Sequence, residues 1–247
     1  MTIYPERIVP DNTPVGIVAI HLKRYGFAGS YLDGKRVLDV ACGVGYGTGY
    51  LADEGNHVIG VDIDGAAIAY AQQRYGGPRN TNFVISDAMQ LGLRSSQFDA
   101  VCSFETIEHV GDVDVFLNEV RRVLRPRGVF IVSTPRVAHS DARPANPHHH
   151  QEWNPSDFEQ LLRAHFKNVD VFGQSRRETS TARWLKRLDV LRLRTWLLPH
   201  WLTRLVAQAS GVHAMADLHS EDVFIRRGDF HRASEIVAVA TDENQRY

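Results

Sequence analysis

One short stretch of the chain combines residue types that commonly bind metal ions. It reads FDAVCSFETIEHV, and Glu105, Glu108 and His109 stand in it at spacings of three and four residues. If these residues begin a helix, that spacing puts two carboxylates and an imidazole on one face. Neighbouring carboxylates repel each other and a divalent cation relieves the repulsion, so the set favours Mg²⁺ or Mn²⁺. The alternative is that Glu108 and His109 only cap and hydrogen-bond at a turn.

A second stretch, NPHHHQEW at residues 146–153, contains three consecutive histidines in the middle of the chain. Imidazole is a common metal ligand, and its pKa near neutrality also suits it to act as a general base. The stretch could therefore supply metal ligands, supply a catalytic base, or form a polar loop.

A third stretch, VLDVACGVGYGTGY, is rich in glycine directly after a strand-like apolar run. Its glycines, at positions 43, 45, 47 and 49, let the backbone turn sharply and approach a ligand. The dinucleotide pattern G-x-G-x-x-G, counted from Gly43, needs glycine or alanine at position 48, where this chain has threonine. The stretch therefore disfavours a nicotinamide cofactor.

Acidic residues end the next two strand-like runs. Asp62 lies about twenty residues beyond the glycines, where a carboxylate can accept hydrogen bonds from both hydroxyls of a ribose. Asp64 is expected to cap the helix that begins at Gly65. Asp87 is placed to accept from the exocyclic amine of an adenine, beside the backbone of Ala88. Because parallel strands end at one edge of a sheet, these acids predict an adenosine pocket there.

Alternating strands and helices are expected to position these residues. Apolar, β-branched runs predict seven strands, at residues 36–41, 57–63, 83–87, 98–105, 129–135, 168–175 and 234–241. Helical spacing predicts helices at 48–54, 65–74 and 112–124, and Asn154, Pro155 and Asp157 mark the start of another. Such alternation is typical of parallel βαβ units. We predict an α/β fold with a doubly wound, mostly parallel, seven-stranded sheet and a helical insertion before the last strand.

The composition is that of a globular protein. With 247 residues, 43% of them hydrophobic, the chain can bury one large core, so we expect a single domain over 1–247. A formal net charge of −1 provides no general attraction to nucleic acid or to anionic membranes. The sequence shows neither a membrane-spanning run nor a signal-peptide pattern, and we expect a cytoplasmic protein. Cys42 and Cys102 adjoin strand-like runs, which favours buried, reduced thiols.

Four parts are expected within this domain: an N-terminal lid or substrate segment (1–30), a cofactor-binding core (31–175), a basic helical insertion (176–220) and the final strand (221–247). The insertion contains three of the four tryptophans and many Arg and Lys residues, interleaved with leucines. It could be a lid over the active site, an arm that makes a homodimer, a helix resting on anionic lipid, or an amphipathic helix packed on the domain.

Residues 30 to 175 resemble the class I S-adenosylmethionine-dependent methyltransferases. The resemblance is carried by VLDVACGVGYG, VIGVDID, SDAMQL, FDAVCSFETIEHV and FLNEVRRVLRPRGVFIVSTP, which occur in the order that the family has them. It implies methyl transfer from S-adenosylmethionine, with residues assigned to each part of the cofactor. They are Asp39, Ala41, Gly43 and Gly45 for the methionine part, Asp62 and Ile63 for the ribose, Asp87 and Ala88 for the adenine, and Phe104 along the flank. The chain departs from the family pattern at Ala41 and Arg127, where glycine is frequent.

The E-x-x-E-H pattern also resembles the metal motif of two methyltransferase groups, the ubiquinone-pathway O-methyltransferases and the small-RNA terminal ribose methyltransferases. In the second group a histidine from an H-x-x-E-W segment completes the site, and the matching residue counted back from Trp153 is His149. The resemblance implies a set of ligands for Mg²⁺ or Mn²⁺, namely Glu105, Glu108, His109 and His149. His148 and His150 are then candidates for the general base or for contacts with substrate hydroxyls.

The segments YPERIVPD and HLKRYGFA resemble methyltransferases of bacterial glycan and surface-polysaccharide pathways. A metal ion chelated by two neighbouring sugar hydroxyls would account for the ligand set and would activate a hydroxyl. We therefore expect an O-methyltransferase whose acceptor is a sugar or short oligosaccharide, such as a methylated mannoside. One alternative is a ribose 2′-O-methyltransferase on RNA, although the near-neutral chain favours a small substrate. Others are methylation of a phenolic or quinone-pathway metabolite, and a scaffold that binds the cofactor without catalysis.

Overall fold

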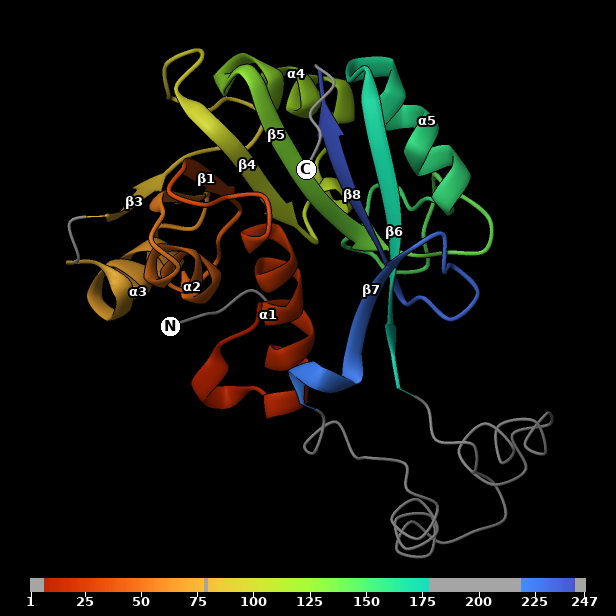
Figure 1. Cartoon of the computed structure of the whole chain (residues 1–247), viewed down its shortest axis with the longest axis horizontal. Coiled ribbons are helices and arrows are strands. Elements are labelled where there is room, and N and C mark those ends of the chain that lie inside the picture. The colour runs from red at the N-terminus through yellow and green to blue at the C-terminus, as the bar shows by residue number, and fades with distance from the viewer. Residues whose placement is uncertain (1–6, 78–79, 178–218, 243–247) are drawn as a thin grey trace, which may run out of the picture.

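The structure is a computed structural model that describes residues 7–77, 80–177 and 219–242. Its centre is one eight-stranded sheet in the order β3-β2-β1-β4-β5-β8-β6-β7, covered by helices on both faces (Figure 1). The prediction of an α/β, doubly wound and mostly parallel sheet is confirmed. The predicted number of seven strands is wrong, because the structure adds an eighth.

The strands are β1 (Arg36–Val40), β2 (His57–Asp62), β3 (Thr81–Ile85), β4 (Phe98–Phe104), β5 (Leu124–Pro135), β6 (Asn168–Arg176), β7 (Val223–Arg227) and β8 (Glu235–Thr241). Strands β1 to β5 pair in parallel, β8 lies antiparallel between β5 and β6, and β7 pairs antiparallel with β6. The additional strand is β7, which forms one edge of the sheet. Its five residues end in two exposed arginines, so it lacks the long apolar run by which the inner strands are found.

The helices are α1 (Val15–Gly29), α2 (Tyr46–Asp53), α3 (Gly65–Tyr75), α4 (Val113–Val123) and α5 (Pro155–His165), with short 3₁₀ turns η1 (Pro10–Asn12), η2 (Ile107–His109) and η3 (Ser220–Asp222). Side-chain oxygens of Asp64, Asp112 and Asn154 accept backbone N–H groups at the starts of α3, α4 and α5. The caps expected at Asp64 and Asn154 are thereby confirmed.

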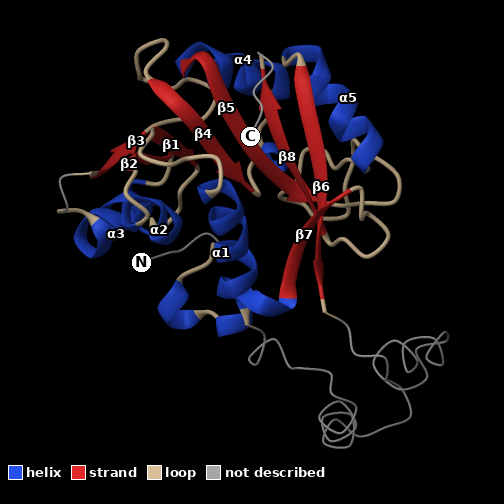
Figure 2. Ribbon diagram, viewed as in Figure 1, coloured by secondary structure: helices blue, strands red, loops and turns tan. Residues whose placement is uncertain are grey.

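The helices are divided between the two faces of the sheet. Figure 2 shows α1, α2 and α3 on one face and α4 and α5 on the other. On the α4 and α5 face, Phe116 and Phe158 are fully buried in a cluster with Phe130 of β5. On the opposite face, Leu32 and Leu51 are fully buried against the sheet. Burial on both faces explains why β1, β4 and the second half of β5 have apolar residues next to one another and do not alternate apolar with polar residues.

The two cysteines, Cys42 and Cys102, are buried and free, as predicted. The basic insertion falls almost entirely on residues 178–218, which lie outside the described residues. In the part of the chain that the structure describes, no helix is both long and apolar enough to cross a membrane.

Candidate active site

A cavity of about 360 Å³ opens where β1 to β4 end at their carboxyl edge, the place where open parallel sheets bind ligands. Most of the cofactor residues expected from the sequence line it. They are Ala41, Gly43, Asp62, Ile63, Asp87, Ala88 and Phe104. Asp39 and Gly45 do not line it. The N-terminal segment and α1 supply further lining residues, among them Arg7 and His21.

The carboxylate of Asp62 is held by backbone amides at the end of β2. The N–H of Gly43 donates to its Oδ2 at 2.8 Å, and the N–H of Asp64 donates to its Oδ1 at 2.9 Å. Arg7 also contacts Asp62, 3.3 Å from Oδ1, and forms an ion pair with Asp64. Each carboxylate oxygen has two lone pairs, and these contacts use three of the four, so Oδ2 can still accept from one ribose hydroxyl and a second hydroxyl must replace the long Arg7 contact on Oδ1.

Asp39 supports the cavity from behind. Its side chain is fully buried, and it accepts hydrogen bonds from the hydroxyls of Thr48 at 2.6 Å and Tyr25 at 3.2 Å. Burial raises the pKa of Asp39 to about 7, although these hydrogen bonds oppose the shift. Asp39 therefore ties β1 to α1 and α2, and the structure does not bring it to the cavity where the resemblance implied contact with a methionine group.

The glycine-rich loop is packed too closely for side chains. Gly45 precedes α2 with φ +82°, and a Cβ there would lie 2.7 Å from the Phe83 ring. A Cβ on Gly47 would lie 1.9 Å from the ring of Tyr25, so α1 rests directly on the first turn of α2. Gly45 thus shapes the loop without lining the cavity.

Both departures from the family pattern fall at strained backbone positions. Ala41 has φ +59° and Arg127 has φ +69°, in the left-handed region that favours glycine. The frequent glycines at these positions therefore have a conformational reason, and this chain accepts some strain at both.

Asp87 and Ala88 lie in the turn that follows β3. One carboxylate oxygen of Asp87 accepts the N–H of Met89 at 2.8 Å, and its carbonyl accepts the N–H of Gln90 at 3.1 Å. These bonds hold the turn against the cavity. Phe104, the last residue of β4, packs edge-on against the Tyr25 ring at 4.8 Å and closes the opposite side.

Glu105 does not share a helical face with Glu108 and His109. It has φ +52° and precedes η2, a single turn of three residues that begins at Ile107. Its Oε1 accepts the hydroxyl of Ser133 at 2.6 Å and lies 3.7 Å from a guanidinium nitrogen of Arg24. The expected helix over these residues is therefore wrong, and the left-handed backbone turns Glu105 toward α1.

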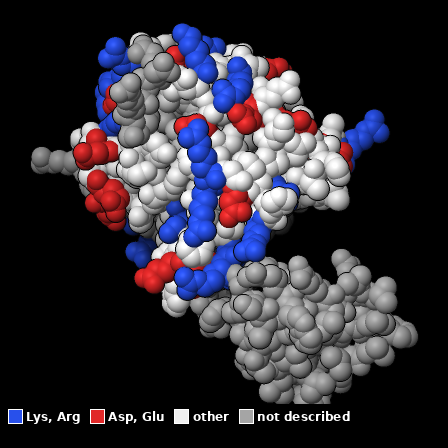
Figure 3. Space-filling view, turned by 45° about the vertical axis from the view of Figure 1, so that its right-hand side comes forward, with Lys and Arg blue, Asp and Glu red and all other residues white. Residues whose placement is uncertain are grey.

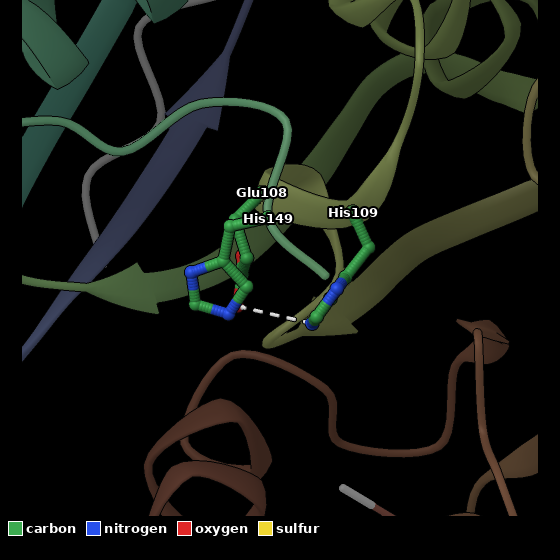
Figure 4. Close-up of side chains that lie close together, drawn as sticks. All are labelled: Glu108, His109 and His149. Carbon is green, nitrogen blue, oxygen red and sulfur yellow. Dashed lines mark ion pairs between the residues drawn. The ribbon is translucent and has the colours of Figure 1, made fainter. Parts of the chain in front are cut away.

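Glu108, His109 and His149 come together, with one potential ligand atom of each within 4.8 Å of the others. Figure 4 shows the two imidazole rings beside Glu108, coming from separate segments of the chain. Glu108 is 1% exposed, and its Oε2 accepts the hydroxyl of Thr134 at 3.0 Å. Its Oε1 is buried without a hydrogen-bond partner and lies 3.9 Å from Nε2 of His109. The structure thus assembles three of the four expected metal ligands, without Glu105.

Hydrogen bonds set the tautomers of the two imidazoles. Nδ1 of His109 lies 2.9 Å from the carbonyl oxygen of His148, and Nδ1 of His149 lies 2.6 Å from Oε1 of Glu152. A nitrogen beside an oxygen that only accepts must carry the proton, so Nε2 carries the lone pair in both neutral rings. In His149 this lone pair accepts from the side-chain amide of Asn146 at 3.0 Å, which a cation would replace. Contacts of this kind from an outer carboxylate or carbonyl are typical of metal-binding histidines.

The donor set fits a divalent cation. Burial raises the pKa of Glu108 well above its ordinary value, and the charge of Glu105 adds to the shift. A cation would favour the ionised carboxylate and would give its orphaned oxygen a partner. Two imidazole nitrogens with one carboxylate suit Mn²⁺ better than Mg²⁺, which prefers oxygen ligands.

The histidines expected to act as a base lie outside the cavity lining. His148 and His150 are exposed, although the N–H of His150 donates to the carbonyl of Glu108 at 2.7 Å and ties their loop to η2. His21 and His109 line the cavity instead. His21 was missed as a site residue, and its only sequence signal was the HLKRYGFA segment of α1.

His21 is held as a neutral hydrogen-bond donor. The guanidinium of Arg24 donates to its Nδ1 at 2.8 Å, so Nε2 carries the proton. Burial and the charge of Arg24 lower the pKa of His21 well below its ordinary value. His21 can therefore donate a hydrogen bond to a ligand but is poorly suited to accept a proton.

Comparisons with known proteins agree with this geometry. Residues 38–132 match the methyltransferase domain family. A probable S-adenosylmethionine-dependent methyltransferase of Mycolicibacterium smegmatis is 41% identical over 144 residues, covering 57% of this chain and 55% of the relative. A fatty-acid O-methyltransferase of the same species is 35% identical over 146 residues, covering 54% of this chain and 50% of that protein. The chain thus spans about half the length of these curated relatives.

Solved structures share the fold over nearly the whole chain. The crystal structure of an S-adenosylmethionine-dependent methyltransferase from Thermotoga maritima, described as a possible histamine N-methyltransferase, aligns with a TM-score of 0.62 at 15% identity. The alignment covers 92% of this chain and 93% of that one, and at this identity it shows the fold alone. Residues 38–132 are thus similar to the methyltransferase domain family, and the chain has the fold of the class I S-adenosylmethionine-dependent methyltransferases.

Proposed function

We propose that the chain is an S-adenosylmethionine-dependent O-methyltransferase that acts on a hydroxyl of a sugar or short oligosaccharide, assisted by a divalent cation. The cation would be held by Glu108, His109 and His149. The observation that carries the proposal is the buried, unpartnered Oε1 of Glu108, 3.9 Å from Nε2 of a histidine that lines the cofactor cavity. A buried acceptor of this kind is costly unless a ligand satisfies it.

An oxygen acceptor is favoured by the way the chain can activate it. S-adenosylmethionine supplies a methyl group on a positively charged sulfur, ready for in-line displacement. An alcohol needs either a general base or a cation that lowers its pKa. His21 is a poor base because Nδ1 accepts from Arg24, and His109 lies beside the buried Glu108 carboxylate, where it would serve as a ligand of the proposed cation. Cation assistance therefore has better support than a histidine base acting alone.

A sugar acceptor is favoured by the proposed cation and by the histidines beside it. Two neighbouring hydroxyls can chelate one cation, which would orient the hydroxyl that attacks and lower its pKa. The exposed His148 and His150 belong to the loop that is tied to His109 and Glu108, which brings them close to the proposed acceptor. Their proposed role is thus acceptor binding.

A lipid or phenolic acceptor is the second candidate function. It is favoured by the similarity to a fatty-acid O-methyltransferase and by the similarity to a ubiquinone biosynthesis O-methyltransferase of Azorhizobium caulinodans. RNA has less support, because the chain carries a net charge of −1 and the face in Figure 3 intersperses acidic with basic side chains.

The test is turnover across sugar, oligosaccharide, fatty-acid and phenol acceptors, with and without EDTA. We expect oligosaccharide turnover that EDTA abolishes and that Mn²⁺ restores better than Mg²⁺. Turnover that survives complete chelation would contradict cation assistance, and turnover of lipids alone would favour the second candidate.

Cation binding can be measured without turnover, by titration of the free chain with Mn²⁺ followed by electron paramagnetic resonance. His149→Ala is expected to weaken Mn²⁺ binding about 100-fold, since it removes a ligand. The matched control is His165→Ala, because His165 also bonds a carboxylate, that of Asp114 at 2.8 Å, and lies on α5. Equal Mn²⁺ affinity in both variants would show that the cluster holds no cation.

A further inference from the structure

Arg7 lies against the part of the cavity that is expected to bind the ribose. Its side chain is 13% exposed and lines the cavity, where it contacts Asp62 and forms an ion pair with Asp64. Its Nε also lies 3.9 Å from the place where a Cβ on Gly43 would be. The guanidinium therefore crosses the glycine loop and reaches both acids at the end of β2.

The residues after Arg7 are anchored at two further points. Val9 is 7% exposed and packs in a small apolar cluster with Val44 of the glycine loop and Ala67 of α3. The hydroxyl of Tyr70, also on α3, donates to Asp11 at 3.2 Å. Residues 7–12, which we call the strap, thus run from the glycine loop to α3, and the first two of them, Arg7 and Ile8, form one wall of the cavity.

We infer that Arg7 latches the strap over the ribose side of the cavity and thereby slows the release of the cofactor product, S-adenosylhomocysteine. This inference rests on the proposed cofactor site. Asp62 and Asp64 are two neighbouring carboxylates, and the guanidinium offsets their repulsion. A ribose hydroxyl that donates to Oδ1 of Asp62 takes the place of the long 3.3 Å contact, while Arg7 keeps its pair with Asp64.

Arg7 could instead compete with the cofactor, and this role predicts the opposite change in binding. If the guanidinium only occupied the ribose position, it would compete with the cofactor, and removing it would tighten binding. If it latches the strap, removing it opens one wall of the cavity and speeds dissociation. The direction of the change in the dissociation rate therefore separates the two roles.

The experiment measures dissociation of a fluorescent S-adenosylhomocysteine analogue from the full-length chain by stopped-flow displacement. Arg7→Ala is expected to speed dissociation about tenfold, because it removes charge-assisted hydrogen bonds to two carboxylates. Val9→Ala is expected to act in the same direction, because it loosens the second anchor without touching either acid. The matched control is Arg163→Ala, which breaks an exposed ion pair with Glu159 on α5 and should leave the rate unchanged.

Arg7→Lys provides a second test if Arg7→Ala fails to fold. Lysine keeps the charge but is a point donor that cannot bridge both carboxylates, so an intermediate dissociation rate is expected. An unchanged rate in Arg7→Ala and Val9→Ala, or tighter binding in Arg7→Ala, overturns the latch while leaving the cofactor site intact. If the unsubstituted chain does not bind the analogue, the proposed cofactor site is contradicted, and so is the latch that rests on it.

Discussion

The proposed cofactor side of the cavity and the proposed acceptor side, which is the cluster of Glu108, His109 and His149 at its edge, are built from different kinds of structure. On the cofactor side, the ends of parallel strands and their backbone amides hold Asp62, and glycines allow α1 to pack on the loop. On the acceptor side, Glu108, His109 and His149 are held by a three-residue turn and by bonds between loops. We therefore expect substitutions on the cofactor side to change folding and cofactor binding together, and those on the acceptor side to change turnover while cofactor binding is kept.

The largest effect is expected on the acceptor side, from Glu108→Gln. The amide keeps the shape and can still accept from Thr134, but it removes the ionised ligand of the proposed cation. We expect kcat to fall about 1,000-fold, comparable to the loss of one strong electrostatic contribution to the transition state. S-adenosylhomocysteine affinity, measured by calorimetry, should stay within about twofold of the original. A parallel loss of cofactor affinity would contradict the separation of the two sides.

The next effect is expected on the cofactor side, from Gly47→Ala. The new Cβ would lie 1.9 Å from the Tyr25 ring and must displace α1. We expect the free energy of unfolding to fall by about 3 kcal/mol, at the upper end for overpacking, with cofactor affinity lost in parallel. Gly29→Ala is the control, since a Cβ there meets nothing within 4 Å. Denaturant unfolding and calorimetry measure both quantities, and a stable variant that binds no cofactor would break the expected coupling.

Asp39 is expected to make the stability of the cofactor side depend on pH. Its pKa is about 7 in the folded chain against an ordinary value of 3.8, so the unfolded chain releases this proton first as pH rises. The contribution of Asp39 to the free energy of unfolding is therefore fully present below pH 3.8 and is lost as pH rises through 7. Between pH 5 and 7, the free energy of unfolding of the unsubstituted chain should fall by about 2 kcal/mol relative to that of Asp39→Asn. Urea unfolding of both chains across this pH range tests the prediction. If their free energies of unfolding change with pH in parallel, the raised pKa is refuted.

The smallest effect is expected away from both sides, from Arg127→Gly. Arg127 has φ +69°, and glycine adopts this conformation without strain. We expect the free energy of unfolding to rise by about 1 kcal/mol, with the melting temperature about 2–4 °C higher. Turnover and cofactor affinity should not change. Lower stability would mean that the arginine side chain contributes more than its backbone strain costs.

The parts of the molecule built from strands and strand ends were predicted from the sequence better than the parts built from loops. Long apolar runs predicted β1, β2, β4, β5, β6 and β8, because strands that are buried on both faces leave a continuous signal. The edge strand β7 was missed because an edge needs only a short apolar pattern. Most expected cofactor residues line the cavity, because their positions follow from where strands end.

The acceptor side was predicted less completely. The sequence pattern put Glu105, Glu108 and His109 on one face, but a left-handed residue turned Glu105 away. A single positive φ is decided by packing and leaves little trace in a residue pattern. His21 is equally hidden, because its place in the cavity depends on how α1 packs on the loop at Gly47.

By itself, the sequence determined the α/β class, the resemblance that assigns the cofactor and the residue types available at the edge of the sheet. These depend on local periodicity, on turn chemistry and on the shared direction of parallel strands. Only the tertiary structure decided that Glu105 turns away from Glu108 and His109, that Asp39 is a support behind the cavity, and that Arg7 reaches Asp62. These outcomes depend on contacts between segments far apart in the chain, which local patterns do not encode.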